Sequence, residues 1–309
     1  MRLQKNGAAS AGRLRGRISP LQICAFVYLY LPILLFLILW IRPLFAALAL
    51  FGLFAAVLFA LRDRQNSGIP EDRAAREWRG RSTLLPGLLV ACAVLLAWCV
   101  LSGLGGFARQ SLDWEKHNFI LRLLTENSWP VVTELNGERG MLVYYVAGYL
   151  VPAVIGRLFG SFRAAELTML GWSFLGLVLV LLVLCRALRL RRSRDVVLLS
   201  LSMMLFSTFL TPVAGIYANL VPGDSGTGEQ WYWLSTTYPV QFSSNMMLLR
   251  WVSPQAVSGW LLTAALLTER KKIENWGLLL IPAVLYSTFV FVGLGMLMLF
   301  FVIADAVLL

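Results

Sequence analysis

The chain has 309 residues, of which 59% are hydrophobic and only 14% are charged, and its formal net charge is +11. This composition excludes an ordinary soluble domain, because such a domain does not need so much apolar surface. Repeated apolar runs of about 20 residues predict transmembrane helices, and their continuous rather than alternating hydrophobicity excludes a transmembrane barrel. Basic residues gather in short segments between these runs. That is the positive-inside pattern of a multi-pass membrane protein, and it argues against a nucleic-acid partner.

The N-terminal part is predicted to be a tail, a membrane hairpin and a linker. Residues 1–17 carry five basic residues and no acidic one, which predicts a cytosolic tail and a cytosolic N-terminus. Residues 18–61 are predicted to form a transmembrane hairpin with spans at 20–41 and 44–61. The first apolar run is too long for the core of a signal peptide, so we expect it to be retained. Residues 62–82, rich in arginine, form a predicted cytosolic linker.

The remaining chain, residues 83–309, is predicted to form the main membrane domain. A third span at 84–104 leads into a large outer loop at 105–166, and residues 112–124 within it have helical periodicity. Such a helix would lie in the interface, with an apolar stripe toward the bilayer and a polar stripe toward water. The two stripes are, respectively, Leu112, Phe119 and Leu123, and Asp113, Lys116 and His117.

The apolar segment 141–156 allows two topologies. If it crosses the membrane, the next span at 167–187 ends outside and places the five arginines of residues 186–194 there, against the positive-inside pattern. If it lies on or dips into the outer face, these arginines become cytosolic, and the loop at 105–166 holds six basic and six acidic residues. Three tyrosines and Pro152 also suit an interfacial or re-entrant helix, so we expect the second topology.

The C-terminal half completes the predicted bundle. Further spans are expected at 196–214 and 254–268, on either side of a second outer loop at 215–252. The last apolar block, 276–309, is too long for one span and is predicted to turn at the outer face between residues 287 and 293. The sum is eight spans with both termini inside. Because the sequence stops on apolar residues, either it ends at the membrane or it is truncated relative to a longer protein.

Candidate catalytic groups gather in the first outer loop. Asp113 is placed to act as a base toward a hydroxyl group, and His117 can approach it, since the two are four residues apart on a helix. Basic residues nearby could hold a phosphate. The competing interpretation is the polar face of an interfacial helix that meets lipid headgroups. The residues predicted to bind substrate here are Glu115, Lys116, Asn118 and Arg122.

The second outer loop supplies further candidates, and metal chemistry is reduced to one option. Gln241, Asn245 and Arg250 are predicted to bind sugar hydroxyls or a phosphate, and a hydrated loop is the alternative. A single histidine and scattered acids do not make a zinc site, which leaves a Mg²⁺ or Mn²⁺ ion at Asp113 as the open case. The four cysteines lie in apolar runs without CxxC spacing and are expected to be core residues.

Four short elements follow one another in the order of a known family. They are Asp113-Trp114, Trp129-Pro130, Leu142-Val143-Tyr144-Tyr145 and Leu158-Phe159-Gly160. This order resembles the C-type (GT-C fold) membrane glycosyltransferases that use polyprenyl-phosphate sugars, such as aminoarabinose transferases and protein mannosyltransferases. The resemblance implies an all-α polytopic GT-C-like fold and matches Asp113 to the acidic residue proposed there as the catalytic base or as the group that positions the acceptor. The chain departs from it where Arg163 precedes Glu166, the reverse of the usual order.

The leading functional hypothesis is therefore sugar transfer at the outer face of a bacterial plasma (inner) membrane. The donor would be a polyprenyl-phosphate-linked sugar, the acceptor a cell-envelope molecule, and the lipid tail would reach the site between helices. The alternatives are a transporter or flippase of lipid-linked substrates, and a non-catalytic assembly partner with the same fold. Transport ranks lower, because the predicted spans are nearly free of ionisable residues and show no internal repeat.

Overall fold

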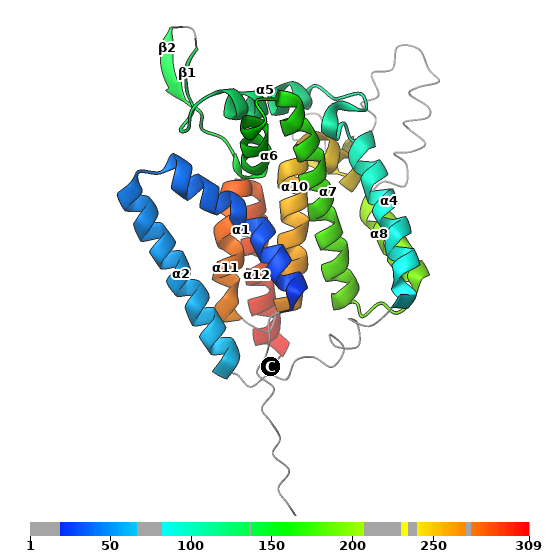
Figure 1. The fold of residues 1–309 in the computed structure, drawn as a ribbon. Coiled ribbons are helices and arrows are strands. Elements are labelled where there is room, and N and C mark those ends of the chain that lie inside the picture. The colour runs from blue at the N-terminus through cyan, green and yellow to red at the C-terminus, as the bar shows by residue number, and fades with distance from the viewer. Residues whose placement is uncertain are drawn as a thin grey trace, which may run out of the picture.

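The computed structural model describes residues 19–66, 82–135, 137–206, 230–233, 240–269 and 273–308, and these are mostly helical. The chain is an integral membrane protein, because several of its helices are long and apolar enough to cross a bilayer. These are α1 (Pro20–Trp40), α2 (Pro43–Asn66), α7 (Phe162–Ala187) and α12 (Thr288–Leu308). The bundle also contains α4 (Leu85–Leu101), α8 (Ser193–Leu205), α10 (Asn245–Glu269) and α11 (Trp276–Tyr286), as Figure 1 shows.

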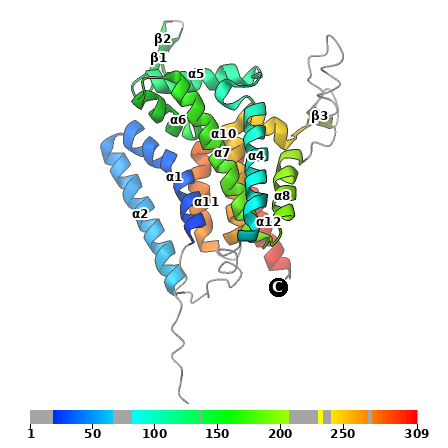
Figure 2. The same cartoon turned by 45° about the vertical axis from the view of Figure 1, so that its right-hand side comes forward.

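Two helices occupy one end of the bundle (Figures 1 and 2). Helix α5 (Asp113–Glu126) lies across that end, as expected for an interfacial helix over 112–124, and α6 (Ala147–Leu158) packs against it. With 12 residues, α6 is about 18 Å long, much less than the roughly 30 Å of a bilayer core. The 11-residue α11 is as short, so the position of α6 beside α5 at this end, rather than its length alone, agrees with an interfacial or re-entrant segment.

The turn from α4 to α5 is made by glycine. Gly103, Gly105 and Gly106 have φ values of 95°, 75° and 69°, which side chains rarely tolerate, so α4 ends at Leu101. A Cβ atom at Gly103 would also lie only 3.0 Å from the indole nitrogen of Trp114. The glycines therefore both reverse the chain and let α5 approach the end of α4.

The expectation of an all-α chain is wrong for two short antiparallel hairpins. Strand β1 (Val132–Leu135) pairs with β2 (Glu138–Met141) with Val132 opposite Met141, and β3 (Gln230–Trp233) pairs with β4 (Val240–Ser243) with Gln230 opposite Ser243. The sequence Asn136-Gly137 favours a tight hairpin, and Gly137 has a φ of 82°. The exposed β2 projects from the α5 end of the bundle, where water can satisfy its edge (Figure 1).

The last apolar block divides more sharply than predicted. Helix α11 ends at Tyr286, Ser287 alone is extended with φ −176° and ψ 132°, and α12 begins at Thr288. Gly293, the predicted far end of the turn, therefore lies inside a helix. The two helices pack against each other, and α12 ends near the end of the bundle at which α1 starts (Figure 1).

Helix α2 is set apart from the rest of the bundle. It packs mainly against α1, and only 6% of its most apolar stretch is buried within the protein. Helix α1, in contrast, contacts α6, α7 and α11, and the hydroxyl of Tyr30 donates to the carbonyl of Leu278 at 2.5 Å. The N-terminal hairpin is thus attached through its first helix.

The centre of the bundle depends on a close approach at Gly176 of α7. A Cβ atom there would lie 2.5 Å from the hydroxyl oxygen of Tyr28 in α1 and would also overlap Val257 in α10. Glycine is therefore what lets α7 contact both neighbours at this level, as small residues do in other membrane bundles.

We predict that Gly176→Ala destabilises the bundle by about 1–3 kcal/mol, the usual cost of overpacking. Gly171→Ala in the same helix is the matched control, since a Cβ there meets nothing within 4 Å. Thermal unfolding in detergent should show a lower Tm for Gly176→Ala and no loss for Gly171→Ala. Equal Tm values for the two variants would contradict this packing.

Candidate functional site

Helix α5 buries a face that includes His117. Trp114, Ile120, Leu121 and Leu124 share that face and are nearly inaccessible, and His117 is only 2% exposed. The predicted polar stripe was therefore wrong for His117, which belongs to the packed face. In the predicted apolar stripe, Leu112 and Phe119 are 84% and 56% exposed, whereas Leu123 is partly buried against the core. Since α5 carries apolar residues on two faces, periodicity alone did not decide which one packs.

The start of α5 is fixed to the preceding turn by side-chain hydrogen bonds. The indole of Trp114 donates to the Ser102 carbonyl at 3.2 Å, and the Gln110 amide donates to the Gly103 carbonyl at 2.9 Å. Asn118, predicted to bind substrate, donates to the side-chain oxygen of Gln110 at 2.9 Å and so extends this network. Asn118 therefore has a structural role in positioning α5.

His117 joins three helices. Its Nε2 lies 2.5 Å from the main-chain carbonyl oxygen of Trp251 in α10, and its Nδ1 contacts the hydroxyl of Tyr149 in α6. A carbonyl oxygen can only accept, so Nε2 carries the proton and donates, while Nδ1 accepts from the Tyr149 hydroxyl. A neutral imidazole thus satisfies both contacts, and it binds α5 to α6 and α10.

The Trp251 carbonyl is available because α10 is kinked beside it. Val252 has non-helical backbone angles, φ −138° and ψ 41°. Pro254, two residues later, has no N–H for the carbonyl of Arg250, four positions earlier. A break of this kind leaves carbonyl groups without their helical donors. The imidazole of His117 satisfies one of them.

Burial sets the charge state of His117. It lowers the pKa of the imidazole below the usual 6.5, and the charge of Lys116 acts in the same direction. The hydrogen bond to Trp251 and the charge of Asp113 oppose this shift but do not cancel it. The buried ring is therefore neutral at pH 7, a state in which both of its hydrogen bonds can form.

Asp113 lies at the water-exposed edge of the same helix. Its side chain is 43% exposed and forms an ion pair with Lys116 at 3.6 Å. The predicted Asp113–His117 pair is not formed, because Tyr149 and Trp251 occupy both imidazole nitrogens. Asp113 is thus a solvent-accessible carboxylate one helical turn from a buried, neutral histidine. Chemically, it can accept a proton from a bound hydroxyl.

The other predicted substrate-binding residues of α5 are spread along it. Glu115 is exposed, and Lys116 lies 5.9 Å from the ring centroid of Tyr144. Arg122 pairs with Glu126 at 3.1 Å and stacks on Phe162 at 4.2 Å, near the far end of the helix. The structure therefore keeps Lys116 beside Asp113 and separates Arg122 from it.

The predicted residues of the second outer loop differ in their environments. The side chain of Gln241 lies outside the described part of the structure. Asn245 donates to the Met203 carbonyl of α8 at 2.7 Å, which holds the start of α10. Arg250 is half-buried, and within the described residues its Nε is buried without a hydrogen-bond partner. The buried hydroxyl of Ser253 likewise finds none among the described residues.

Among the described residues, Arg250 therefore stands out as a half-buried cation with a buried nitrogen that has no partner, since buried polar groups ordinarily have one. It directly precedes Trp251, whose carbonyl receives the His117 hydrogen bond. The exposed carboxylate of Asp113 precedes His117 by one turn on the other side of this bond. No group of three or more metal-binding side chains occurs among the described residues.

Two groups that matter here, Tyr149 and the carbonyl of Trp251, were missed in the sequence. Tyr149 follows the tyrosine pair of the segment 141–156, but nothing in its spacing distinguished it from its neighbours. One feature of the sequence could have indicated a free carbonyl near Trp251. Pro254 lies inside an apolar helix, and proline leaves carbonyl groups on the preceding turn without their helical donors.

Because His117 is neutral when buried, the stability of the protein should depend on pH. Its folded pKa lies below the unfolded value of 6.5, so the unfolded chain binds the extra proton first. The free energy of unfolding should therefore fall as the pH drops below about 6.5, and level off below the folded pKa. Thermal unfolding measured between pH 7.5 and 5 checks this. The chain has one histidine, so His117→Gln should lose this slope, and an identical slope in that variant would refute the assignment.

Comparisons with known proteins do not assign the chain. No family model matches it, and neither a curated protein nor a solved structure does. Its function is therefore inferred from the geometry of α5, α6 and α10 and from the order of the four short sequence elements.

Proposed function

We propose that this protein is a multi-pass inner-membrane glycosyltransferase of the GT-C type. It transfers a sugar from a polyprenyl-phosphate donor to a cell-envelope acceptor at the outer face. One observation carries the proposal: the His117–Trp251 hydrogen bond joins α5 to α10 next to Arg250, whose buried Nε has no partner among the described residues, and one helical turn from the exposed carboxylate of Asp113. Phosphate-glycosyl transfer requires a cation for the leaving phosphate and a base for the acceptor.

The proposed topology has eight spans, formed by α1, α2, α4, α7, α8, α10, α11 and α12, with α5 and α6 outside. As far as the structure describes these ranges, each contains a helix, and the shortest are α8 and α11 with 13 and 11 residues. The turn between α7 and α8 carries the arginines of residues 186–194 and lies at the end of the bundle opposite α5 (Figure 1). Under the positive-inside rule, that turn faces the cytosol and α5 faces the outside.

In the proposed reaction, Asp113 accepts the proton of the acceptor hydroxyl. The freed oxygen attacks the anomeric carbon of the donor sugar, and the bond between that carbon and the phosphate oxygen breaks. The polyprenyl phosphate leaves with the bonding electrons, and Arg250 stabilises its added negative charge. His117 is a positioning residue, because both its nitrogens are used to hold α5 in place.

We predict that Asp113→Asn lowers sugar transfer by about 10²–10⁴-fold, the usual contribution of a general base. Glu138→Gln is the matched control, since it removes an exposed carboxylate in β2, away from the proposed site. The measurement is the envelope glycan profile, by mass spectrometry, of cells that carry each variant at equal expression. Unchanged glycans with Asp113→Asn would remove Asp113 from the mechanism and favour a non-catalytic assembly role.

A second prediction separates binding from stability at Arg250. Without ligand, Arg250→Ala should leave Tm unchanged or raise it, because it removes a half-buried charge that has no partner among the described residues. Farnesyl phosphate should raise the Tm of the wild type, since a ligand of the native state stabilises it, and this shift should be lost in the variant. Arg194→Ala, at the opposite end of the bundle, should keep the shift. A full shift in Arg250→Ala would contradict the phosphate role.

A further inference from the structure

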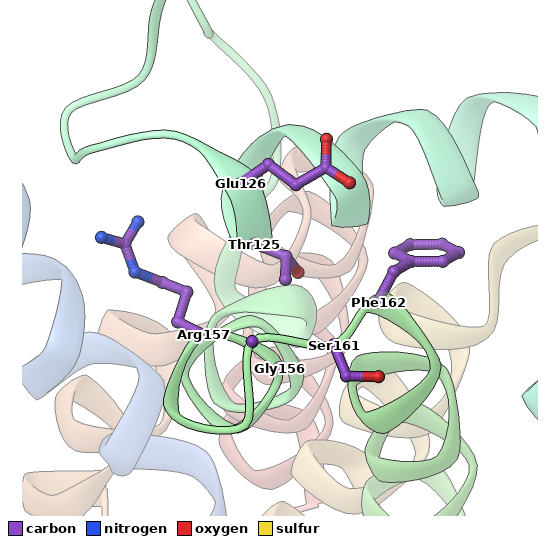
Figure 3. Close-up of a pocket in the computed structure, with 7 residues that line it drawn as sticks. Thr125, Glu126, Gly156, Arg157, Ser161 and Phe162 are labelled. Carbon is purple, nitrogen blue, oxygen red and sulfur yellow. The ribbon is translucent and has the colours of Figure 1, made fainter.

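A surface cavity lies at the far end of α5 from Asp113. Its volume is about 330 Å³, and it opens where the end of α5 meets the turn between α6 and α7 (Figure 3). Asp113 does not line it, and twelve residues, or about 18 Å of helix, separate Asp113 from Thr125. The cavity is therefore distinct from the proposed catalytic site.

The shape of this cavity comes from small residues at its base. A Cβ atom at Gly156 would lie 2.7 Å from Ala165 and 2.9 Å from the methyl group of Thr125, so glycine there lets α6 contact both α5 and α7. Gly160, with φ 58°, turns the chain, and a Cβ there would meet nothing within 4 Å. Figure 3 shows Arg157 on one side of the cavity, Phe162 on the other and Glu126 above.

The charges around the cavity leave one arginine without an acid. Arg122 pairs with Glu126, and Arg163 pairs with Glu166, each at 3.1 Å. Arg157 donates to the main-chain carbonyl of Asn127 and lies 5.6 Å from the ring centroid of Trp129, but it has no carboxylate partner among the described residues. Since Glu126 already accepts from Arg122, the cavity suits an anion that carries no amine.

The apolar surroundings show where such an anion would come from. Leu158 and Phe159, which follow Arg157 directly, are each 74% exposed. They lie just before α7, which has 26 residues and is therefore about 39 Å long, more than the roughly 30 Å of a bilayer core. The first turn of α7 thus reaches headgroup depth, where exposed leucine and phenylalanine side chains contact acyl chains and arginine contacts phosphate.

We propose that this cavity binds the phosphodiester of an anionic phospholipid whose headgroup has no amine, with Arg157 as the phosphate ligand. Leu158 and Phe159 lie along the acyl chains of the same lipid. Because Glu126 and Thr125 belong to α5, the bound lipid fastens the end of that helix to the α6–α7 turn. This site does not depend on the catalytic proposal, and its test involves no sugar transfer.

The test uses the full chain in nanodiscs of phosphatidylcholine alone or with 30% phosphatidylglycerol. Hydrogen–deuterium exchange of residues 121–129 and 156–163 is measured in each, and native mass spectrometry counts the phosphatidylglycerol retained. The wild type should gain protection in both segments with phosphatidylglycerol and retain one such lipid. Arg157→Gln should weaken this retention by about tenfold or more, as expected when a charge-assisted hydrogen bond is lost. Arg139→Gln, in the exposed β2, should retain it.

Further variants and a soluble phosphate compound serve as controls for this test. Arg157→Lys keeps the charge and should retain lipid partly, and Leu158→Ser with Phe159→Ser should weaken retention without altering the cavity. These variants decide the matter if Arg157→Gln is misfolded in phosphatidylcholine. Glycerol phosphate added to phosphatidylcholine discs should give no protection. If it protected as well as phosphatidylglycerol does, the proposal that the phosphate belongs to a lipid would be overturned. Equal protection from phosphatidylglycerol in the wild type and Arg157→Gln would overturn the site.

Discussion

The hydrogen bonds of one buried imidazole determine how the end of this bundle is assembled. His117 donates to a carbonyl that the kink of α10 leaves available, and it accepts from a tyrosine of α6. Three segments that are far apart in sequence therefore meet at one neutral ring. The polar residues of α5 and the neighbouring Arg250 of α10 derive their positions from this contact.

The same contact explains how irregular backbone is tolerated near the bilayer. An interrupted helix exposes carbonyl groups whose desolvation is costly where water is scarce. In α10 the break at Val252 and Pro254 lies beneath α5, which supplies a donor from its own side chain. The interfacial helix thus satisfies part of the backbone that it covers, and a kink that would otherwise destabilise α10 becomes the point at which α5 attaches.

Much of this architecture was predictable from the sequence, and the rest was not, for identifiable reasons. Apolar runs located the helices, because this signal is local. The packed face of α5 was not predictable, since Leu112 and Phe119 form a stripe as apolar as that of Trp114 and Leu124. The partners of His117 lie 32 and 134 residues away in the sequence. One of them is a main-chain oxygen, which cannot be recognised from the identity of a side chain.

The isolation of α2 has a consequence for how this protein can vary. Helix α2 packs mainly against α1, and nearly all of its apolar surface lies outside the protein core. Few shape-specific contacts constrain its side chains, so length and overall hydrophobicity are the properties that selection acts on there. Leucine, phenylalanine and alanine should exchange freely along α2, whereas α7, which carries Gly176 between two neighbours, permits little substitution at that level.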